Sequence, residues 1–463
     1  MRKTKVICTI GPATNSEQKI VSLIEGGMNV ARVNMSHGTN QEHIETIKTI
    51  KRARTICDAP VGIMVDLKGP EIRVGLFEDG KVNLKRGDNF AFDSSSRLGT
   101  QQRVGVSCEK IFGVLKKGQK LLLSDGAIEL VVQSTDKKSA ICKVVCGGTL
   151  SNNKSINIPG VDLGLNYLSE VDKLDILMAI SQGADFLALS FVQSKANVEE
   201  VRSFLENNGG ENIKLIAKIE SKNGVKNMEE IIDAADGVMV ARGDLGVEID
   251  FVKLPHIQNK MLEIALKKHK FSITATQMLI SMVKESRPTR AEITDISNAI
   301  ISGSGAVMLS EETAVGAHPS LCVKTMAKIA LECEKYIPEV ESQGSRNNGF
   351  GGLCLAAVSA AKKSKIKNIV VTTALGKSAE EISAYRPSSD IWAFTPTEKC
   401  YYQMSILFGV VPCKMKVVKS GINLWTAVKE IIAKNNLLKP QKIVFVSGEP
   451  TTMENSVLEI KQI

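Results

Sequence analysis

Eight short apolar runs, each ending on a polar residue and followed by an amphipathic stretch of helix length, constrain the fold more than any other feature. They start at Val6, Asn29, Val61, Asp185, Lys214, Gly237, Phe271 and Ala306. Strands that alternate with helices predict a parallel α/β fold. Eight such units favour a closed (β/α)8 TIM barrel, whose active-site residues lie at the carboxyl ends of the strands.

The residues at those eight ends are polar and rich in groups that bind metals and anions. They are Thr9, Asn34 with Ser36, Asp66, Ser190, Lys218 with Glu220, Arg242 with Asp244, Thr274 with Thr276, and Ser310 with Glu311. Any one of them can simply be a polar residue that ends a strand. Their shared position on one face of a barrel indicates a site.

The alternation is interrupted between the third and fourth runs. Residues 69–159 show period-two strands with turn signals, such as Asp125-Gly126 within LLLSDGAIELVV and the turn from Asp136 to Ser139. This pattern predicts an inserted β-barrel domain within a catalytic barrel of residues 1–68 and 160–338. An insertion at the top of the third strand overhangs the barrel mouth, where it can act as a lid.

A polar, glycine-rich segment, ESQGSRNNGFGG, follows the eighth unit. Beyond it, the strand patterns NIVVTT, IWAFTP and KIVFVSG alternate with the helix patterns LAAVSAAKKS and KSAEEISAYR. We expect a second, open α/β domain over residues 345–463, with a role in regulation or oligomerisation.

Composition narrows the class of protein. The chain of 463 residues carries a net charge of +9, but its basic residues are dispersed and aromatic residues are only 4%. A small anionic substrate therefore explains the charge better than a nucleic acid does. No apolar run approaches the roughly 20 residues that span a bilayer, and the start of the chain lacks a secretory pattern. We expect a cytoplasmic protein that binds no membrane, with reduced cysteines.

Lys218, Glu220 and Asp244 form the sharpest candidate constellation. Residues two apart in a strand point the same way, so Lys218 and Glu220 can both face the mouth, next to Asp244 at the end of the neighbouring strand. Two carboxylates suit Mg²⁺ when phosphate oxygens and water complete its shell. The alternative interpretation is an ordinary structural ion pair.

Two further stretches supply anion-binding and oxygen-donor groups. The turn Gly243-Asp244-Leu245-Gly246 is expected to expose backbone N–H groups to a carboxylate or phosphate, while Arg242 either adds charge or braces the loop. ARVNMSHG and VDLKGPEIR contribute cations and oxygen donors, namely Arg32, Asn34, Ser36, Asp66 and Arg73. The sequence contains neither a G-x-x-x-x-G-K-[ST] phosphate loop nor a complete dinucleotide fingerprint.

Nine motifs spread in order along the chain resemble those of the pyruvate kinase family, of bacterial type. They are CTIGPAT, NVARVNMSHG, DLKGPEIR, SFVQS, AKIES, GVMVARGDLGVEI, TATQML, ESRPTRAEITDISNAI and MLSEETAVG. The resemblance implies a glycolytic transferase that moves the phosphoryl group of phosphoenolpyruvate to ADP, giving pyruvate and ATP. It also implies a homotetramer with Mg²⁺ (or Mn²⁺) and K⁺ as cofactors.

The resemblance also implies roles for individual residues. Lys218, Thr276 and Arg32 would be catalytic, and Gly243 and Asp244 would join them in holding the substrate. The nucleotide would meet Arg73 and Lys154. Glu220 and Asp244 would bind Mg²⁺, whereas the K⁺ ligands would be Asn34, Ser36, Asp66 and the carbonyl of Leu67.

Two positions depart from the family pattern: Leu67 stands where the family often has threonine, and Glu311 replaces a common glycine. Glu71 keeps the acidic residue that accompanies K⁺ dependence in the family. The loop VVTTALGKSAEE resembles an allosteric effector loop that would hold a phosphate with Thr372, Thr373, Gly376, Lys377 and Ser378. A capped strand-to-helix junction explains the same pattern, and the identity of an effector stays open.

Two other functions fit parts of the sequence. A metal-dependent phosphoenolpyruvate or pyruvate aldolase or lyase would also pair two carboxylates at a barrel mouth, but would not need Arg73, Lys154 or a lid over a nucleotide. An adhesion module would use Arg242-Gly243-Asp244 as a surface tripeptide. The apolar strand directly before the tripeptide disfavours that interpretation.

Overall fold

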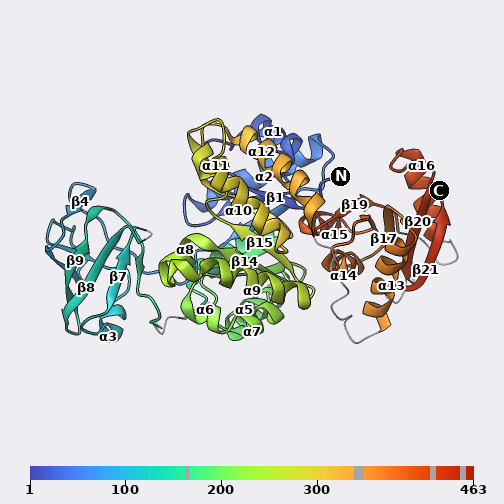
Figure 1. Ribbon diagram of the computed structural model, residues 1–463. Helices are drawn as coiled ribbons and strands as arrows, with labels where there is room; N and C mark the ends of the chain where they lie inside the picture. The colour runs from blue at the N-terminus through green and yellow to red at the C-terminus, as the bar shows by residue number, and fades with distance from the viewer. Residues whose placement is uncertain (125, 162–165, 338–348, 418–423, 449–454) are drawn as a thin grey trace.

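The computed structural model describes residues 1–124, 126–161, 166–337, 349–417, 424–448 and 455–463 (Figure 1). Eight parallel strands close into a barrel in the order β1-β16-β15-β14-β13-β12-β3-β2. Their bounds are β1 (Lys5–Thr9), β2 (Val30–Asn34), β3 (Gly62–Asp66), β12 (Phe186–Leu189), β13 (Lys214–Ile219), β14 (Gly237–Ala241), β15 (Phe271–Ala275) and β16 (Ala306–Leu309). The predicted TIM barrel is confirmed, and each strand lies within its predicted run except β1, which begins one residue earlier, at Lys5.

The helices cover the outside of the barrel. They are α1 (Glu17–Gly26), α2 (Asn40–Ile56), α4 (Glu170–Ser181), α5 (Lys195–Glu206), α6 (Lys222–Lys226), α7 (Met228–Ala234), α8 (Arg242–Glu248), α9 (Leu254–Lys267), α10 (Arg290–Ile301), α11 (Glu311–Ala314) and α12 (Pro319–Cys333), with the short 3-10 helices η1 (Phe251–Lys253), η2 (Ile280–Val283) and η3 (Glu334–Tyr336). Capping boxes at Thr39, Ser169 and Thr289 begin α2, α4 and α10. Each box satisfies backbone N–H groups that a helix start leaves without a partner.

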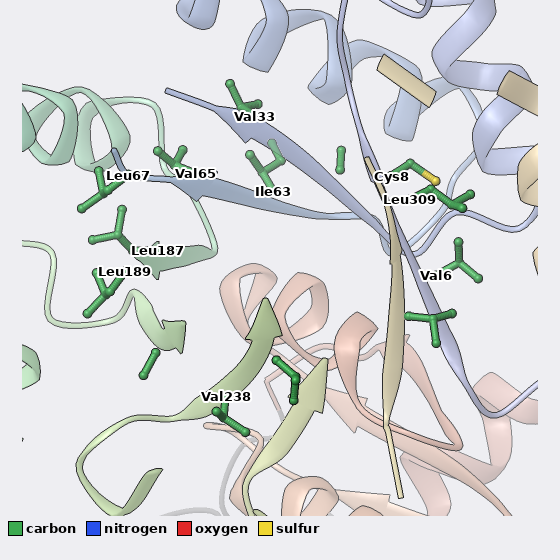
Figure 2. Packing of buried hydrophobic residues seen from close by; sticks show 14 of the residues in the cluster. Val6, Cys8, Val33, Ile63, Val65, Leu67, Leu187, Leu189, Val238 and Leu309 are labelled. Carbon is green, nitrogen blue, oxygen red and sulfur yellow. The ribbon is translucent and has the colours of Figure 1, made fainter. Parts of the chain in front are cut away.

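The strand side chains divide between two hydrophobic clusters. In β1, Val6 and Cys8 pack with helix residues such as Leu23; Figure 2 shows both beside Leu309 and Val33 in this layer between strands and helices. Ile7, between them, belongs to a second cluster that also contains residues of the C-terminal domain. The alternation of strand side chains therefore builds the outer layer and the filled barrel interior at once.

The segment between β3 and β12 forms separate β-sheets that stand apart from the barrel on the side of α8 (Figure 1). A two-stranded sheet pairs β4 (Lys81–Leu84) with β10 (Gly148–Ser151). A second sheet has the order β11-β7-β8-β9-β5-β6 and carries one helix, α3 (Ile111–Val114). Its strands are β5 (Asn89–Asp93), β6 (Arg103–Gly105), β7 (Lys120–Leu123), β8 (Ile128–Thr135), β9 (Ser139–Cys146) and β11 (Ile156–Asn157).

Both predicted turns of this insertion fall between antiparallel strand pairs. β7 pairs with β8, and β8 with β9. The Asp136 N–H donates to the Ser139 carbonyl at 2.9 Å and closes the second turn. Asp125, in the first turn, lies outside the described residues.

The C-terminal domain is an open five-stranded sheet in the order β19-β18-β17-β20-β21, flanked by helices. The strands are β17 (Asn368–Thr372), β18 (Asp390–Thr395), β19 (Val410–Lys414), β20 (Lys442–Gly448) and β21 (Asn455–Gln462), and the helices are α13 (Gly349–Lys363), α14 (Lys377–Ala384), α15 (Glu398–Gln403), α16 (Leu424–Lys434) and η4 (Met404–Ile406). The predicted α/β class is confirmed. The sequence patterns missed β19 and β21, and β21 runs antiparallel to β20.

The predicted boundaries at 338 and 345 lie outside the described residues, as does most of the separating segment. None of the helices in the described parts of the chain is long and apolar enough to cross a membrane.

Candidate active site

A buried lysine stands at the centre of the barrel mouth. Lys218 Nζ lies 3.0 Å from Glu220 Oε1 and 3.2 Å from Asp66 Oδ1, and it hydrogen bonds to Ser190 Oγ at 2.7 Å. Asp66 also accepts a 2.6 Å bond from Arg32 Nε. Strands β2, β3, β12 and β13 thus deliver their carboxyl-end residues to one network. Asp66, Ser190, Lys218 and Glu220 are residues that the sequence placed at strand ends, whereas β2 contributes Arg32 and not the Asn34 and Ser36 predicted at its end.

The network keeps its lysine charged. Burial favours the neutral amine, but Asp66 and Glu220 outweigh burial, and the pKa of Lys218 is raised. Burial likewise works against ionisation of Asp66, yet Lys218 and Arg32 hold the pKa of its carboxyl below the usual range. A cation that is buried and charged is suited to stabilise negative charge on a bound group.

Glu220 is held less completely than Asp66. Its Oε2 accepts a 2.7 Å bond from the Phe191 N–H. Its Oε1 accepts no well-aligned hydrogen bond from the described residues, although Lys218 lies within ion-pair distance. Burial raises the pKa of Glu220 to about 7. The charge of Lys218 opposes this rise, and the charge of Asp244 adds to it. A buried carboxylate oxygen in this state fits a metal ligand.

The sequence Arg242-Gly243-Asp244 is the first turn of helix α8. It is not the irregular turn that the glycines predicted. The Gly243 N–H donates to Thr276 Oγ1 at 2.9 Å. Thr276 itself has a left-handed backbone, with φ of 70°, which is uncommon for a residue with a branched side chain. Two predicted substrate contacts from neighbouring strands therefore meet here.

Arg242 braces this region and points away from the mouth network. Its Nη1 lies 2.8 and 2.6 Å from the two carboxylate oxygens of Asp295, and its Nη2 donates to the Thr276 carbonyl at 2.6 Å. Of the two roles that the sequence left open for Arg242, the geometry supports bracing. Asp295 was missed because it lies inside a helix and carries no local signal.

Several cations approach His37 from different parts of the chain. Burial and then the charges of Arg73, Lys154, Arg32 and Lys68 lower the pKa of this imidazole. Arg73 Nη1 donates to the Asn153 carbonyl at 3.0 Å, and Arg73 Nη2 pairs with Glu71 at 2.6 Å. Arg73 and Lys154 belong to the insertion, so the insertion and the barrel mouth face each other with positive charge.

The residues predicted for K⁺ come from paired strands. Asn34 is aligned with Asp66 in the register of β2 and β3. Asn34 Oδ1 accepts from the Ser36 N–H at 3.2 Å, and the Leu67 carbonyl accepts from Ser190 Oγ at 2.7 Å. Within the described residues, no group of three or more His, Cys, Asp or Glu side chains forms a metal cluster. A metal here would need oxygen from substrates, water or backbone.

Some predicted residues lie elsewhere. Thr274 is fully buried and bonds to Ser304 Oγ at 3.0 Å. The proposed effector residues lie between β17 and α14, in the C-terminal domain. There the Gly376 N–H donates to Thr373 Oγ1 at 2.9 Å, and Gly376 has φ of 83°. This contact closes a turn before α14, whose N-cap, Gly376, has no side-chain capping bond.

A TIM barrel with a buried lysine, two carboxylate-bearing loops and facing cations beneath an inserted β-domain belongs to the class of enzymes that act on small anionic substrates. The family model for the pyruvate kinase barrel domain matches residues 1–323, and that for the pyruvate kinase alpha/beta domain matches residues 352–459. The chain belongs to the pyruvate kinase family, and its activity is that of a phosphotransferase of glycolysis.

Similar proteins agree with this assignment. The chain is 41% identical to pyruvate kinase of Staphylococcus aureus over 459 residues, covering 97% of this chain and 78% of the relative. It is 40% identical to that of Geobacillus stearothermophilus over 457 residues, covering 96% and 77%. A crystal structure of a pyruvate kinase from Cryptosporidium parvum superposes with a TM-score of 0.92 at 34% identity, covering 100% of this chain and 96% of that one. The aldolase or lyase alternative is not favoured.

Proposed function

We propose that the mouth network transfers the phosphoryl group of phosphoenolpyruvate to ADP, with Lys218 as the central cation. In such transfers, charge spreads over the equatorial oxygens of the moving group, and catalysis rests on positioning and electrostatics. Lys218 and Arg32 both lie against Asp66, so two cations border the same space. This arrangement is the observation that carries the proposal.

The Gly243 and Asp244 backbone and the Thr276 hydroxyl are proposed to hold the carboxylate of phosphoenolpyruvate. The 2.9 Å contact between Gly243 N and Thr276 Oγ1 supports this, because two possible donors lie close enough to meet one bound oxygen. Thr276 then also lies near the carbon that gains a proton as pyruvate forms. We assign it to passing that proton, through water.

Glu220 and Asp244 are proposed as the ligands of Mg²⁺ or Mn²⁺. The Glu220 oxygen that lacks a well-aligned donor among the described residues fits this role, as does the effect of Asp244 on the Glu220 pKa. When bound, the ion neutralises charge on the phosphoryl oxygens. The protein's part is to hold both carboxylates at adjacent strand ends.

A K⁺ ion is proposed to bind Asn34, Ser36, Asp66 and the Leu67 carbonyl. All four donors are oxygens, as hard cations require, and replacing threonine by leucine leaves the carbonyl in place. Glu71, which accompanies K⁺ dependence in the family, pairs with Arg73. We therefore expect higher turnover in potassium buffer; equal rates in sodium-only and potassium buffers would contradict this assignment.

The nucleotide is proposed to contact Arg73 and Lys154, the cations that the lid brings towards His37. This role makes residues 69–159 a lid domain, with residues 1–68 and 160–338 as the catalytic domain. Residues 345–463 are proposed to regulate and oligomerise the protein, which we expect to be a cytoplasmic homotetramer. The loop from Thr372 to Ser378 is the proposed phosphate site for an effector.

A coupled assay tests the main proposal. Folded protein is mixed with phosphoenolpyruvate, ADP, Mg²⁺ and K⁺, and pyruvate is followed with and without ADP. We expect pyruvate to form only when ADP is present. Pyruvate formation that does not depend on ADP, or none at all, would contradict the proposed reaction. Saturation curves repeated with fructose 1,6-bisphosphate, ribose 5-phosphate and AMP would identify an effector.

A further inference from the structure

Two connections join the lid to the barrel, and each contains a glycine with a left-handed backbone. Gly69 has φ of 70° and Gly160 has φ of 76°. A Cβ on Gly69 would lie 2.8 Å from the Ser190 carbonyl oxygen, and one on Gly160 would lie 3.2 Å from Lys222 Cδ. Glycine adopts this conformation at little cost, whereas a side chain would be strained and crowded at both positions.

Each of these glycines donates its N–H to a carboxylate of a barrel helix. Gly69 donates to Asp172 Oδ1 of α4 at 3.2 Å, and Gly160 to Glu248 Oε2 of α8 at 3.4 Å. Asp172 also closes the capping box of α4 with Ser169, so its other contacts are local. Glu248 differs, because its other contacts reach separate parts of the site.

Glu248 links three segments through one carboxylate. Its Oε2 accepts from the Gly160 N–H. Burial raises the pKa of Glu248, and Gly160, the Asn157 side chain and the Lys222 backbone, which all lie at this carboxylate, oppose the rise. Asn157 and Gly160 belong to the lid connection. Lys222 follows Glu220 by two residues, on the loop that leaves β13. Glu248 is itself the last residue of α8, the helix whose first turn contains Asp244.

The lid also approaches the same end of α8 at a second point. A Cβ on Gly126 of the lid would lie 3.5 Å from Val247 Cγ2. Figure 1 shows α8 on the side of the barrel that faces the lid. A small cavity of about 60 Å³ lies beneath the connection, lined in part by Glu71, Asn157 and Glu248. Residues of the connection and of α8 therefore line the same cavity.

We propose that Glu248 is a positioning residue for the phosphoryl transfer, which couples the orientation of the lid to the loop that carries Glu220 and to the helix that carries Asp244. A rigid-body movement of the lid must displace Asn157 and Gly160 relative to the Glu248 carboxylate. The Glu248 carboxylate also lies at the loop that follows Glu220, and Glu248 is the last residue of the helix that contains Asp244. A movement of the lid therefore shifts the carboxylates of Glu220 and Asp244 as well. The inference rests on the proposed roles of Glu220 and Asp244 in binding the metal.

The test compares Glu248→Ala and Glu248→Gln with Glu229→Ala, a control at an exposed position of α7. Hydrogen exchange of the free protein is measured over residues 155–161, together with kcat, KM and Mn²⁺ affinity. In Glu248→Ala we expect faster exchange at 155–161 and a kcat about tenfold lower, since hinge and positioning changes of this kind act on turnover. Mn²⁺ affinity should fall by less than kcat does, because both proposed ligands, Glu220 and Asp244, remain.

Glu248→Gln keeps an acceptor for Gly160 and should recover most of the exchange protection and of kcat. It also tests the idea if the alanine variant fails to fold. Control-level exchange and kcat in Glu248→Ala would overturn the inference. An equal loss of Mn²⁺ affinity and kcat in Glu248→Ala, with unchanged hydrogen exchange, would also overturn the inference. That result would show that Glu248 only stabilises helix α8. Asp244→Asn with normal Mn²⁺ affinity would overturn the metal assignment and leave the exchange result for Glu248 intact.

Discussion

The two ends of the barrel both bury charged residues, but they arrange them differently. At the mouth, Lys218 and Arg32 face carboxylates across an open network, and one oxygen of Glu220 lacks a well-aligned donor among the described residues. At the amino end, two buried cations, Arg386 and Lys5, instead donate to backbone carbonyls of the opposing domain. Arg386 donates to the carbonyls of Ile300, Gly303 and Ser304, and Lys5 Nζ donates to that of Val410 at 2.6 Å.

The difference teaches which buried charges indicate function. Arg386 also stacks on Phe408, with its guanidinium carbon 3.9 Å from the ring centre, so its position is fully determined by the domain interface. Lys218 is surrounded by side chains that can exchange partners when a ligand arrives. Burial of a charge therefore marks a site only when its partners converge on a space that a substrate can enter.

The largest expected effect comes from Lys218→Met, with Lys5→Met as the matched change at the other end. Loss of Lys218 should lower kcat roughly 1000-fold, because the charge that stabilises the moving group is gone. Lys5→Met should leave the turnover of folded protein near the parent value. Steady-state kinetics and circular dichroism check both variants. Similar turnover in the two would contradict the proposed difference between the two ends of the barrel.

Asp244→Asn should lower kcat roughly 100-fold with the fold intact, since an amide binds the metal less strongly than a carboxylate does. Mn²⁺ binding followed by electron paramagnetic resonance should weaken in the same variant. Near-normal turnover would mean that Asp244 lies outside the reacting centre.

At the amino end, Arg386→Met should act on stability. Removing the guanidinium leaves buried carbonyls without their donor, and we expect a loss of about 2 to 4 kcal/mol. The tryptophans, Trp392 and Trp425, both lie in a hydrophobic cluster of the C-terminal domain, so their fluorescence in a urea titration reports on the unfolding of that domain. Lys328→Met, at an exposed position of α12, is the control; an unfolding midpoint equal to that of the control would contradict the structural role.

The smallest expected effect is a change in pH dependence. Burial, followed by the charge of Arg2, lowers the pKa of Lys5 from 10.5 to about 7. Between these two values the unfolded chain binds more protons than the folded one, so this group makes stability rise with pH from about 7 to 10.5. Lys5→Met should flatten the slope in this window. An unchanged slope in unfolding titrations at several pH values would show that Lys5 does not contribute.

Much of the fold was predictable because the strand pattern is local. The barrel strands are short, apolar and closed by polar residues, and the insertion interrupts them with period-two patterns. β19 and β21 escaped prediction for physical reasons. β19 contains Pro412, and a proline usually argues against a strand. Here the strand lies at the edge of the sheet, where a residue without an N–H donor is tolerated. β21 mixes charged residues with apolar ones, and it also forms an edge.

The sequence by itself determined which residues stand at the strand ends, because strand periodicity and the motifs there are properties of neighbouring residues. Only the tertiary structure decided which of them meet. It joined Lys218 to Asp66 and Ser190 across 152 and 28 residues, turned Arg242 towards Asp295, and brought Glu248 to Gly160. Such contacts depend on how distant segments pack, and no local pattern contains that information.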